Sequence, residues 1–355
     1  MTLTITLAEG SLSRRIAVTL AALAAYRLGA CIPLPGLNVP ASLLEAGGSA
    51  PPVERISLMA LGVIPLLSAV MLAEVAMMAW PKLRGWSRVP ANGARLWSWL
   101  ILCALLIAAF QANGIAVALE QITSGLVAEP GLAFRAGVVA SLVAATAFLI
   151  WLASVITRHG IGFGMWILVA APHALSFMKM LMAQAQMTGV AGSPAVLLSA
   201  GYIALTISVL AALTRCRPQL ADTEEAAWAP LLGFTVAHWA LMGALLIPWL
   251  LFSVPPDLPS SDLGITLLML ASLAFAVLLR RRSLARPGEP FAPASAVPLV
   301  LALGGLFLIG VVVPEMAALR LFPSPSTALI LAAVGLMIVE GLATQRTAPA
   351  PKRDS

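Results

Sequence analysis

The sequence predicts an all-α membrane protein with ten transmembrane helices, and its composition is the first reason. Hydrophobic residues make up 60% of the 355-residue chain and charged residues only 10%, with a mean hydropathy of +0.97. Soluble domains contain about 45–50% apolar and about 25% charged residues, so this composition excludes an ordinary soluble fold. Ten apolar stretches, most of them close to the ~20 residues that a helix needs to cross a bilayer, give the number of spans.

The predicted spans follow one another along nearly the whole chain. In order they are Arg15–Ile32, Leu58–Met78, Leu96–Leu119, Phe134–Ile156, Ile161–Met182, Ala195–Leu213, Ala229–Ser253, Leu263–Leu279, Val297–Val313 and Thr327–Thr344. The eighth and ninth are short for a full crossing. No connection between spans is long enough to hold a catalytic domain.

The positions of the basic residues predict the orientation of the spans. Cytoplasmic loops of membrane proteins carry an excess of Lys and Arg. With both termini inside the cell, all but five of the 21 Lys and Arg residues fall in cytoplasmic segments. The five others are Arg27, Arg55, Arg135, Lys179 and Arg320. Topology therefore accounts for the net charge of +6, and no nucleic-acid partner is expected.

The cysteines and histidines predict no metal centre and no cofactor. The three cysteines form no CxxC pair and lie in or beside spans, so we interpret them as small apolar residues. The three histidines are far apart and lack the spacing of metal ligands. At the N-terminus, Ser13-Arg14-Arg15 and the apolar run after it resemble an export signal. Because Arg27 interrupts that run, we expect a retained first span.

Two helix ends in the N-terminal half have unusual sequences. After the first span, Pro33 and Pro35 should end the helix and force extended backbone. Between the fourth and fifth spans, Arg158-His159 leads into a short turn, after which apolar sequence resumes. That turn contains three alternate glycines, Gly160, Gly162 and Gly164. We expect a membrane hairpin here, with Arg158-His159 inside the cell.

Three stretches of this half resemble the SecY family, the channel subunits of bacterial protein translocases. YRLGACIPLPG resembles the end of the family's first helix, and ALGVIPLLSA resembles its second helix. TAFLIWLASVITRHGIGFG resembles the junction of its fourth and fifth helices. Their order and spacing also fit, and the resemblance covers residues 14–171 well. It implies two pseudo-symmetric, inverted halves of five helices each, residues 1–183 and 184–355.

The resemblance also implies a function. We expect a protein-conducting channel subunit of the bacterial cytoplasmic (inner) membrane, without enzymatic activity, that moves secretory proteins across the membrane or inserts membrane proteins into it. Expected partners are SecE-like and SecG-like small membrane subunits, a SecA-type motor or a ribosome, the translocating polypeptide and the lipid bilayer. Inverted repeats place a pathway at their interface, and an apolar constriction seals it against ions by dewetting.

By the same resemblance, the apolar pore ring draws its residues from three helices. These are Val63, Leu67, Met165, Val169 and Leu331. The plug of the closed pore corresponds to residues 41–57, which include Gly47, Gly48, Glu54 and Arg55. The lateral gate would lie between the second and third helices and the seventh and eighth. Packing against lipid or the protein core is the alternative interpretation of the ring residues, because most span residues are apolar.

The C-terminal half departs from the family at two cytosolic loops. The family's loops after the sixth and eighth helices are long and basic, whereas here they shrink to residues 214–228 and 280–293. The second loop keeps Arg286-Pro287-Gly288-Glu289, and by resemblance Arg286 and Gly288 contact the motor or the ribosome. A positive-inside anchor in a Pro/Gly turn is the alternative. The short loops predict weak or absent ribosome docking and a specialised or reduced member of the family.

Two other classes of function compete with a channel. A small-solute secondary transporter with inverted repeats usually carries ionisable residues at mid-span, whereas here the acids within spans are only Glu74 and Glu340. A membrane enzyme needs a cluster of reactive side chains, and the spans contain none. The transporter is therefore the alternative function.

Overall fold

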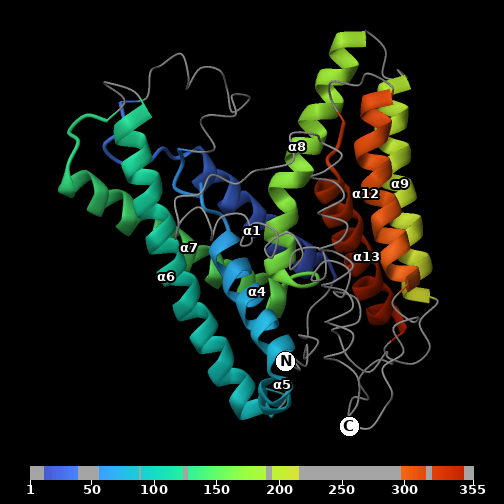
Figure 1. Ribbon diagram of the computed structural model, residues 1–355, viewed down its shortest axis with the longest axis horizontal. Helices are drawn as coiled ribbons and strands as arrows, with labels where there is room; N and C mark the ends of the chain where they lie inside the picture. The colour runs from blue at the N-terminus through green and yellow to red at the C-terminus, as the bar shows by residue number, and fades with distance from the viewer. Residues whose placement is uncertain are drawn as a thin grey trace. The chain divides into compact units, whose positions relative to one another are not determined.

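A computed structural model describes residues 12–38, 56–87, 89–122, 127–188, 194–215, 297–316 and 322–347 of the chain (Figure 1). Within these ranges the protein is almost entirely helical. The helices are α1 (Leu12–Cys31), α4 (Ile64–Ala79), α5 (Pro81–Ser87), α6 (Pro90–Ile122), α7 (Leu132–His159), α8 (Gly164–Thr188), α9 (Pro194–Arg215), α12 (Val297–Met316) and α13 (Pro325–Thr347).

Four of the described helices are long and apolar enough to cross a membrane. Their membrane-capable stretches are Pro90–Gln121, Leu132–His159, Gly164–Gln184 and Ala195–Ala212. Three shorter apolar helices are Ile64–Met77, Val300–Met316 and Pro325–Val339. The longest helix, α6, has 33 residues. At 1.5 Å per residue it is about 50 Å long, more than the ~30 Å hydrocarbon core.

The described helices coincide with eight of the predicted spans, with one clear difference. The span predicted for Leu58–Met78 becomes helical only at Ile64, and the residues before it form turns. The reason is Pro65, which has no N–H and fits best in the first turn of a helix. The prolines after the first span act as expected, because α1 ends at Cys31. The seventh and eighth predicted spans lie outside the described residues.

The chain divides into two compact units. One contains residues 3–72 and 89–171, and the other contains residues 73–88 and 172–355. The chain therefore passes between units inside α4 and inside α8. In α8 the division falls at Pro172, a proline within the helix that cannot donate a backbone hydrogen bond. The predicted halves, residues 1–183 and 184–355, are defined by internal symmetry and not by compactness. They stay a prediction.

In the first unit, α6 packs along α7, and α1 also packs against α7. One face of α6 carries alanines at four-residue intervals, all fully buried, namely Ala104, Ala108, Ala112 and Ala116. Small residues at this spacing let two membrane helices approach closely. Three of these alanines share a core cluster with Val138 and Leu142 of α7. The apolar core of this unit is therefore a seam between α6 and α7.

In the second unit, α9, α12 and α13 lie side by side (Figure 1). The buried Tyr202 of α9 donates a hydrogen bond from its hydroxyl to the carbonyl oxygen of Leu306 in α12, at 2.7 Å. Next to it, Gly310 leaves no room for a side chain between Tyr202 and Pro325. A polar anchor and a close approach thus fix the three helices against one another.

Candidate functional site

Two of the predicted ring residues, Val63 and Leu67, lie at the start of α4. The backbone N–H of Leu67 donates to the carbonyl oxygen of Val63 at 3.0 Å, so the two residues are one helical turn apart. Both are buried, as are all residues from Pro65 to Ala69. A helix that is apolar and buried all round lies inside a protein. Residues 65–69 of α4 are therefore enclosed, whereas Ile64 just before them is 50% exposed and Leu72, further along the helix, is 62% exposed.

Two further ring residues, Met165 and Val169, lie at the start of α8. Met165 is buried and Val169 is half-buried, and the three residues between them are also buried. They follow the hairpin turn directly, four residues apart on one helical face. The fifth ring residue, Leu331, is half-buried in α13 of the second unit. Four of the five predicted ring residues thus lie as two pairs, one at the start of α4 and one at the start of α8.

The hairpin turn before α8 is held by two threonine side chains. The hydroxyl of Thr19 in α1 accepts the backbone N–H of Ile161 at 3.0 Å and donates to the carbonyl oxygen of Arg15. The hydroxyl of Thr157 accepts the N–H of Gly164 at 2.9 Å and donates to Ala153. These bonds satisfy backbone groups that the break between the helices would leave unpaired. The sequence gives no direct sign of Thr19's role.

Each of the three hairpin glycines has a steric reason to be glycine. Gly162 has a φ of +72°, the left-handed region that residues with a Cβ rarely adopt. A Cβ on Gly160 would lie 2.5 Å from the Thr19 hydroxyl. A Cβ on Gly164 would overlap the backbone carbonyl of Ala153. The glycines predicted from the sequence as a turn therefore also set how closely α1, α7 and α8 approach.

At the other end of the first unit, three short segments meet in a backbone contact formed by residues 32–37, 56–58 and 127–128. Pro33 and Ser57 form an antiparallel bridge, with hydrogen bonds from Leu34 to Ile56 and from Leu58 to Ile32, both 2.9 Å. A second bridge joins residues 37 and 127. This three-segment contact joins the two chain ends that flank residues 39–55.

A partly exposed ion pair lies at the same end of this unit. Arg135 of α7 binds one carboxylate oxygen of Glu120 in α6 through two nitrogens, at 2.9 and 2.6 Å. The other carboxylate oxygen accepts the backbone N–H of Gly131 at 2.9 Å. Arg135 is one of the five basic residues that the topology leaves outside the cytoplasmic segments. The structure shows that its charge has a partner, which the sequence did not reveal.

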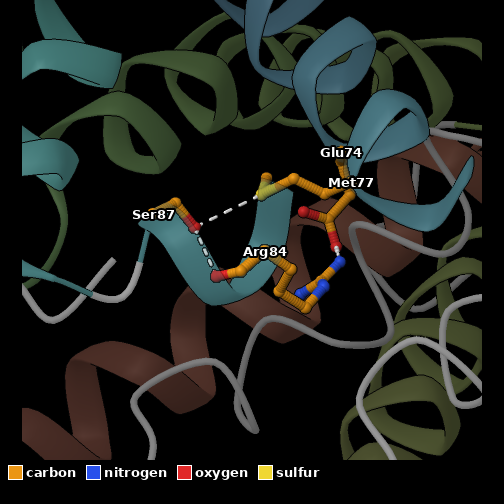
Figure 2. A network of polar contacts seen from close by, with 4 residues as sticks. All are labelled: Glu74, Met77, Arg84 and Ser87. Carbon is orange, nitrogen blue, oxygen red and sulfur yellow. Dashed lines mark hydrogen bonds and ion pairs between the residues drawn. The ribbon is translucent and has the colours of Figure 1, made fainter. Parts of the chain in front are cut away.

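The corner between α4 and α5, residues 74–87, contains a buried ion pair (Figure 2). The guanidinium of Arg84 donates to Glu74 at 2.8 Å, and the two side chains are 6% and 9% exposed. The hydroxyl of Ser87 donates to the Arg84 carbonyl oxygen at 2.9 Å and lies 3.7 Å from the sulfur of Met77. From the sequence, Glu74 is an acidic residue within a predicted span, and Arg84 is a basic residue of a predicted cytoplasmic loop. Here each compensates the other.

The remaining predicted site residues lie outside the described part of the chain. These are Gly47, Gly48, Glu54 and Arg55 of the plug, and Arg286 and Gly288 of the second cytosolic loop. Among the described residues, no group of three or more His, Cys, Asp or Glu side chains could hold a metal ion.

Comparison with known proteins shows which family part of the chain resembles. A model of the SecY family matches residues 57–221. Over 180 residues, the chain is 36% identical to the protein translocase subunit SecY of Escherichia coli strain K12. Over 177 residues, it is 35% identical to the SecY subunit of Haemophilus influenzae. The part of the chain that is similar to the SecY family is therefore residues 57–221. These alignments cover 46% and 45% of the chain, and each covers 40% of the relative.

The SecY-like fold extends beyond the aligned sequence. The structure resembles Sec61 in the canine ribosome-channel complex from the endoplasmic reticulum, with a TM-score of 0.63. It resembles a structure described as a protein conducting channel with the same score. Both comparisons cover 97% of this chain and 95% of the other chain, at 12% identity. The SecY match at 57–221 includes the ring residues of α4 and α8, whereas Arg286 and Leu331 fall outside it.

Proposed function

We propose that this protein is the channel subunit of a protein-conducting channel that moves secretory proteins across a membrane or inserts membrane proteins into it. The observation that carries the proposal is the SecY match over residues 57–221 together with a fold like that of a protein conducting channel. The matched stretch covers only 40% of the relative's length. The channel activity of the full-length relatives is therefore a proposal for this protein.

The proposed seal of the channel is the ring formed by Val63, Leu67, Met165, Val169 and Leu331. What supports it is the burial of Val63, Leu67 and Met165 in the first turns of α4 and α8, whereas Val169 and Leu331 are half-buried. An apolar constriction excludes ions because water does not fill it, yet flexible side chains can give way to an extended polypeptide. Such a channel needs only a constriction of the right shape that excludes water, and no covalent bond is made or broken.

The proposed architecture is ten helices in two inverted halves, in the bacterial cytoplasmic membrane, with both termini in the cytoplasm. The bond between Thr19 and Ile161 supports the proposed orientation, because it joins the start of α1 to the hairpin at one end of the first unit. That end carries Arg14, Arg158 and His159. Lys and Arg accumulate on the cytoplasmic side, so this end is assigned to the cytoplasm.

The plug and the lateral gate complete the proposed channel. The plug is residues 41–57, and the lateral gate lies between the second and third helices and the seventh and eighth. The three-segment contact supports the plug, because it ties Leu34 to Ile56 and so holds both flanks of the plug at one place. A segment anchored at both flanks can return to the same position after each opening.

The proposed partners are SecE-like and SecG-like membrane subunits and a SecA-type motor or a ribosome. Arg286 and Gly288 are the proposed contact with the motor, and the short cytosolic loops favour weak ribosome docking. The small-solute transporter is not favoured, because Glu74 is bonded to Arg84. A coupling carboxylate must be free to exchange a proton or an ion.

A rescue experiment tests the proposed function. In a host depleted of its own SecY, this protein should restore export of a reporter that carries a signal peptide, and a small SecE-like subunit should copurify with it. Arg286→Glu should abolish motor-driven export, whereas Arg346→Glu, the same charge change near the C-terminus, should leave export in place. Failure to rescue export, together with no copurifying subunit, would remove the general-translocase assignment.

An ion-leak experiment tests the ring. Val63→Asn should raise the resting ion conductance of the purified protein in planar bilayers, because a polar side chain lets water fill the constriction. Leu72→Asn, the same kind of change at an exposed position of α4, is the control and should leave the conductance low. Equal conductance in the two variants would show that Val63 does not line the seal.

A further inference from the structure

Arg15 of α1 is a buried charged side chain for which the described residues supply no counter-charge. It is 5% exposed, and its Nε atom has no hydrogen-bond partner. Arg84, which is also strongly buried, is bonded to a glutamate. No described residue forms an ion pair or a side-chain hydrogen bond with Arg15, whose backbone carbonyl alone is bonded, to Thr19. Burial of a charge costs free energy unless a counter-charge compensates it, so we expect an anion to bind Arg15.

The surroundings of Arg15 supply more positive charge and no described acid. The first turn of α1 contains no acidic residue, and the exposed Arg14 is its neighbour. The last turn of α7 ends in Arg158 and His159, both exposed, and the first turn of α8 contains no acidic residue. The bond from Ile161 to Thr19, one turn from Arg15, brings these helix ends together. The missing anion must therefore come from outside the described chain.

The position of the hairpin and the start of α1 relative to a membrane favours a lipid headgroup as the source of the anion. The membrane-capable stretch of α7 ends at His159 and that of α8 begins at Gly164. The hairpin between them is therefore at the boundary of the hydrocarbon core, where lipid phosphates lie. Anionic lipids of the cytoplasmic leaflet attract clusters of basic residues at this depth. A guanidinium also binds a phosphate through two parallel hydrogen bonds, which an ammonium cannot do.

We propose that Arg15 anchors a binding site for the phosphate group of one anionic phospholipid, with Arg158 adding longer-range attraction. The lipid compensates the buried charge and holds the start of α1 against the hairpin. The site depends on the protein lying in a membrane and not on protein translocation, so its test is independent of the rescue experiment.

Lipid retention by the full-length protein tests the site. The protein is purified in detergent, exposed to phosphatidylglycerol or phosphatidylcholine, and examined by native mass spectrometry and thermal unfolding. Arg15→Gln is compared with Arg14→Gln, which removes the same charge at an exposed neighbouring position. Phosphatidylglycerol should bind the parent protein and Arg14→Gln and raise their melting temperatures. Arg15→Gln should bind it at least about tenfold more weakly, since the charge-assisted hydrogen bonds of the guanidinium are lost.

One further variant and two further conditions complete the test. Arg15→Lys should fall between the parent and Arg15→Gln, because it keeps the charge and loses the paired geometry. In phosphatidylcholine alone, Arg15→Gln should melt no lower than the parent, because it removes an uncompensated charge. Inorganic phosphate should not replace the lipid. Equal losses in Arg14→Gln and Arg15→Gln, or a lower melting temperature for Arg15→Gln in phosphatidylcholine, would overturn the proposal.

Discussion

The hairpin before α8 and the corner between α4 and α5 both join two helices within a few residues, but different forces hold them. In the hairpin, backbone N–H groups bond to neutral threonine hydroxyls, and the glycines allow close contact. In the corner, a buried carboxylate and a buried guanidinium face each other at 2.8 Å (Figure 2). The hairpin therefore depends on the absence of side-chain atoms, whereas the corner depends on the presence of two charges.

This difference sets how each connection fails. An added methyl group at Gly164 is harmful because the nearest atoms belong to the Ala153 backbone and cannot move aside. The loss of one charge is harmful in the corner because the other charge stays buried. The following substitutions test these two modes of failure, from the largest expected effect to the smallest.

Removal of one charge from the corner should have the largest effect. Glu74→Ala leaves Arg84 buried and uncompensated, and we expect it to lower the free energy of unfolding by about 3–5 kcal/mol. Chemical unfolding in mixed micelles, followed by tryptophan fluorescence, measures the change.

The matched double variant separates charge from packing. Glu74→Leu with Arg84→Met replaces the pair by apolar side chains of similar size, and it should recover most of the lost stability. The single hydrogen bond of the pair and the unpartnered Arg84 Nε support this expectation. If the double variant is as unstable as Glu74→Ala, the corner depends on shape, and the contrast with the hairpin disappears.

A methyl group in the hairpin should have the next largest effect. Gly164→Ala places a Cβ against the Ala153 carbonyl, and overpacking of this kind costs about 1–3 kcal/mol. Gly137→Ala in α7 is the control, since a Cβ there meets nothing within 4 Å. The control should be neutral or more stable by up to about 1 kcal/mol, because alanine favours helix. Equal effects at the two glycines would contradict a steric role for the hairpin.

Loss of the Thr19 hydroxyl should have the smallest of the three effects. Thr19→Val keeps the shape and leaves the buried N–H of Ile161 without its acceptor, at a cost of about 1–2 kcal/mol. Thr19→Ser keeps the hydroxyl and should retain most of the stability. Hydrogen exchange at the Ile161 amide measures the bond directly, and unchanged protection in Thr19→Val would exclude it.

The helices were largely predictable because membrane spans are set by hydropathy over about 20 residues. The prediction was wrong for Leu58–Met78, where Pro65 fixes the first helical turn and so places the start at Ile64. The glycines of the hairpin were visible because they stand at alternate positions within apolar sequence. In each case the information is local in the chain.

The contacts that support the candidate site were not predictable in this way. Glu120 and Arg135 are 15 residues apart on different helices, and Thr19 is 142 residues from Ile161. No local pattern connects such residues, and their pairing follows only from the packing of α1, α6 and α7. The ring residues came from family resemblance, and their role stays a prediction, although the structure shows that Val63, Leu67 and Met165 are buried.

The central claim is that a polypeptide passes the enclosed starts of α4 and α8, and site-specific crosslinking tests it most directly. A photoreactive amino acid is placed at Leu67, which is buried, or at Trp151, which is 57% exposed on α7. A secretory polypeptide is then arrested during export through the channel. The account predicts crosslinks to the arrested polypeptide from position 67 and none from position 151. No crosslink from position 67, or equal crosslinking from both positions, would contradict it.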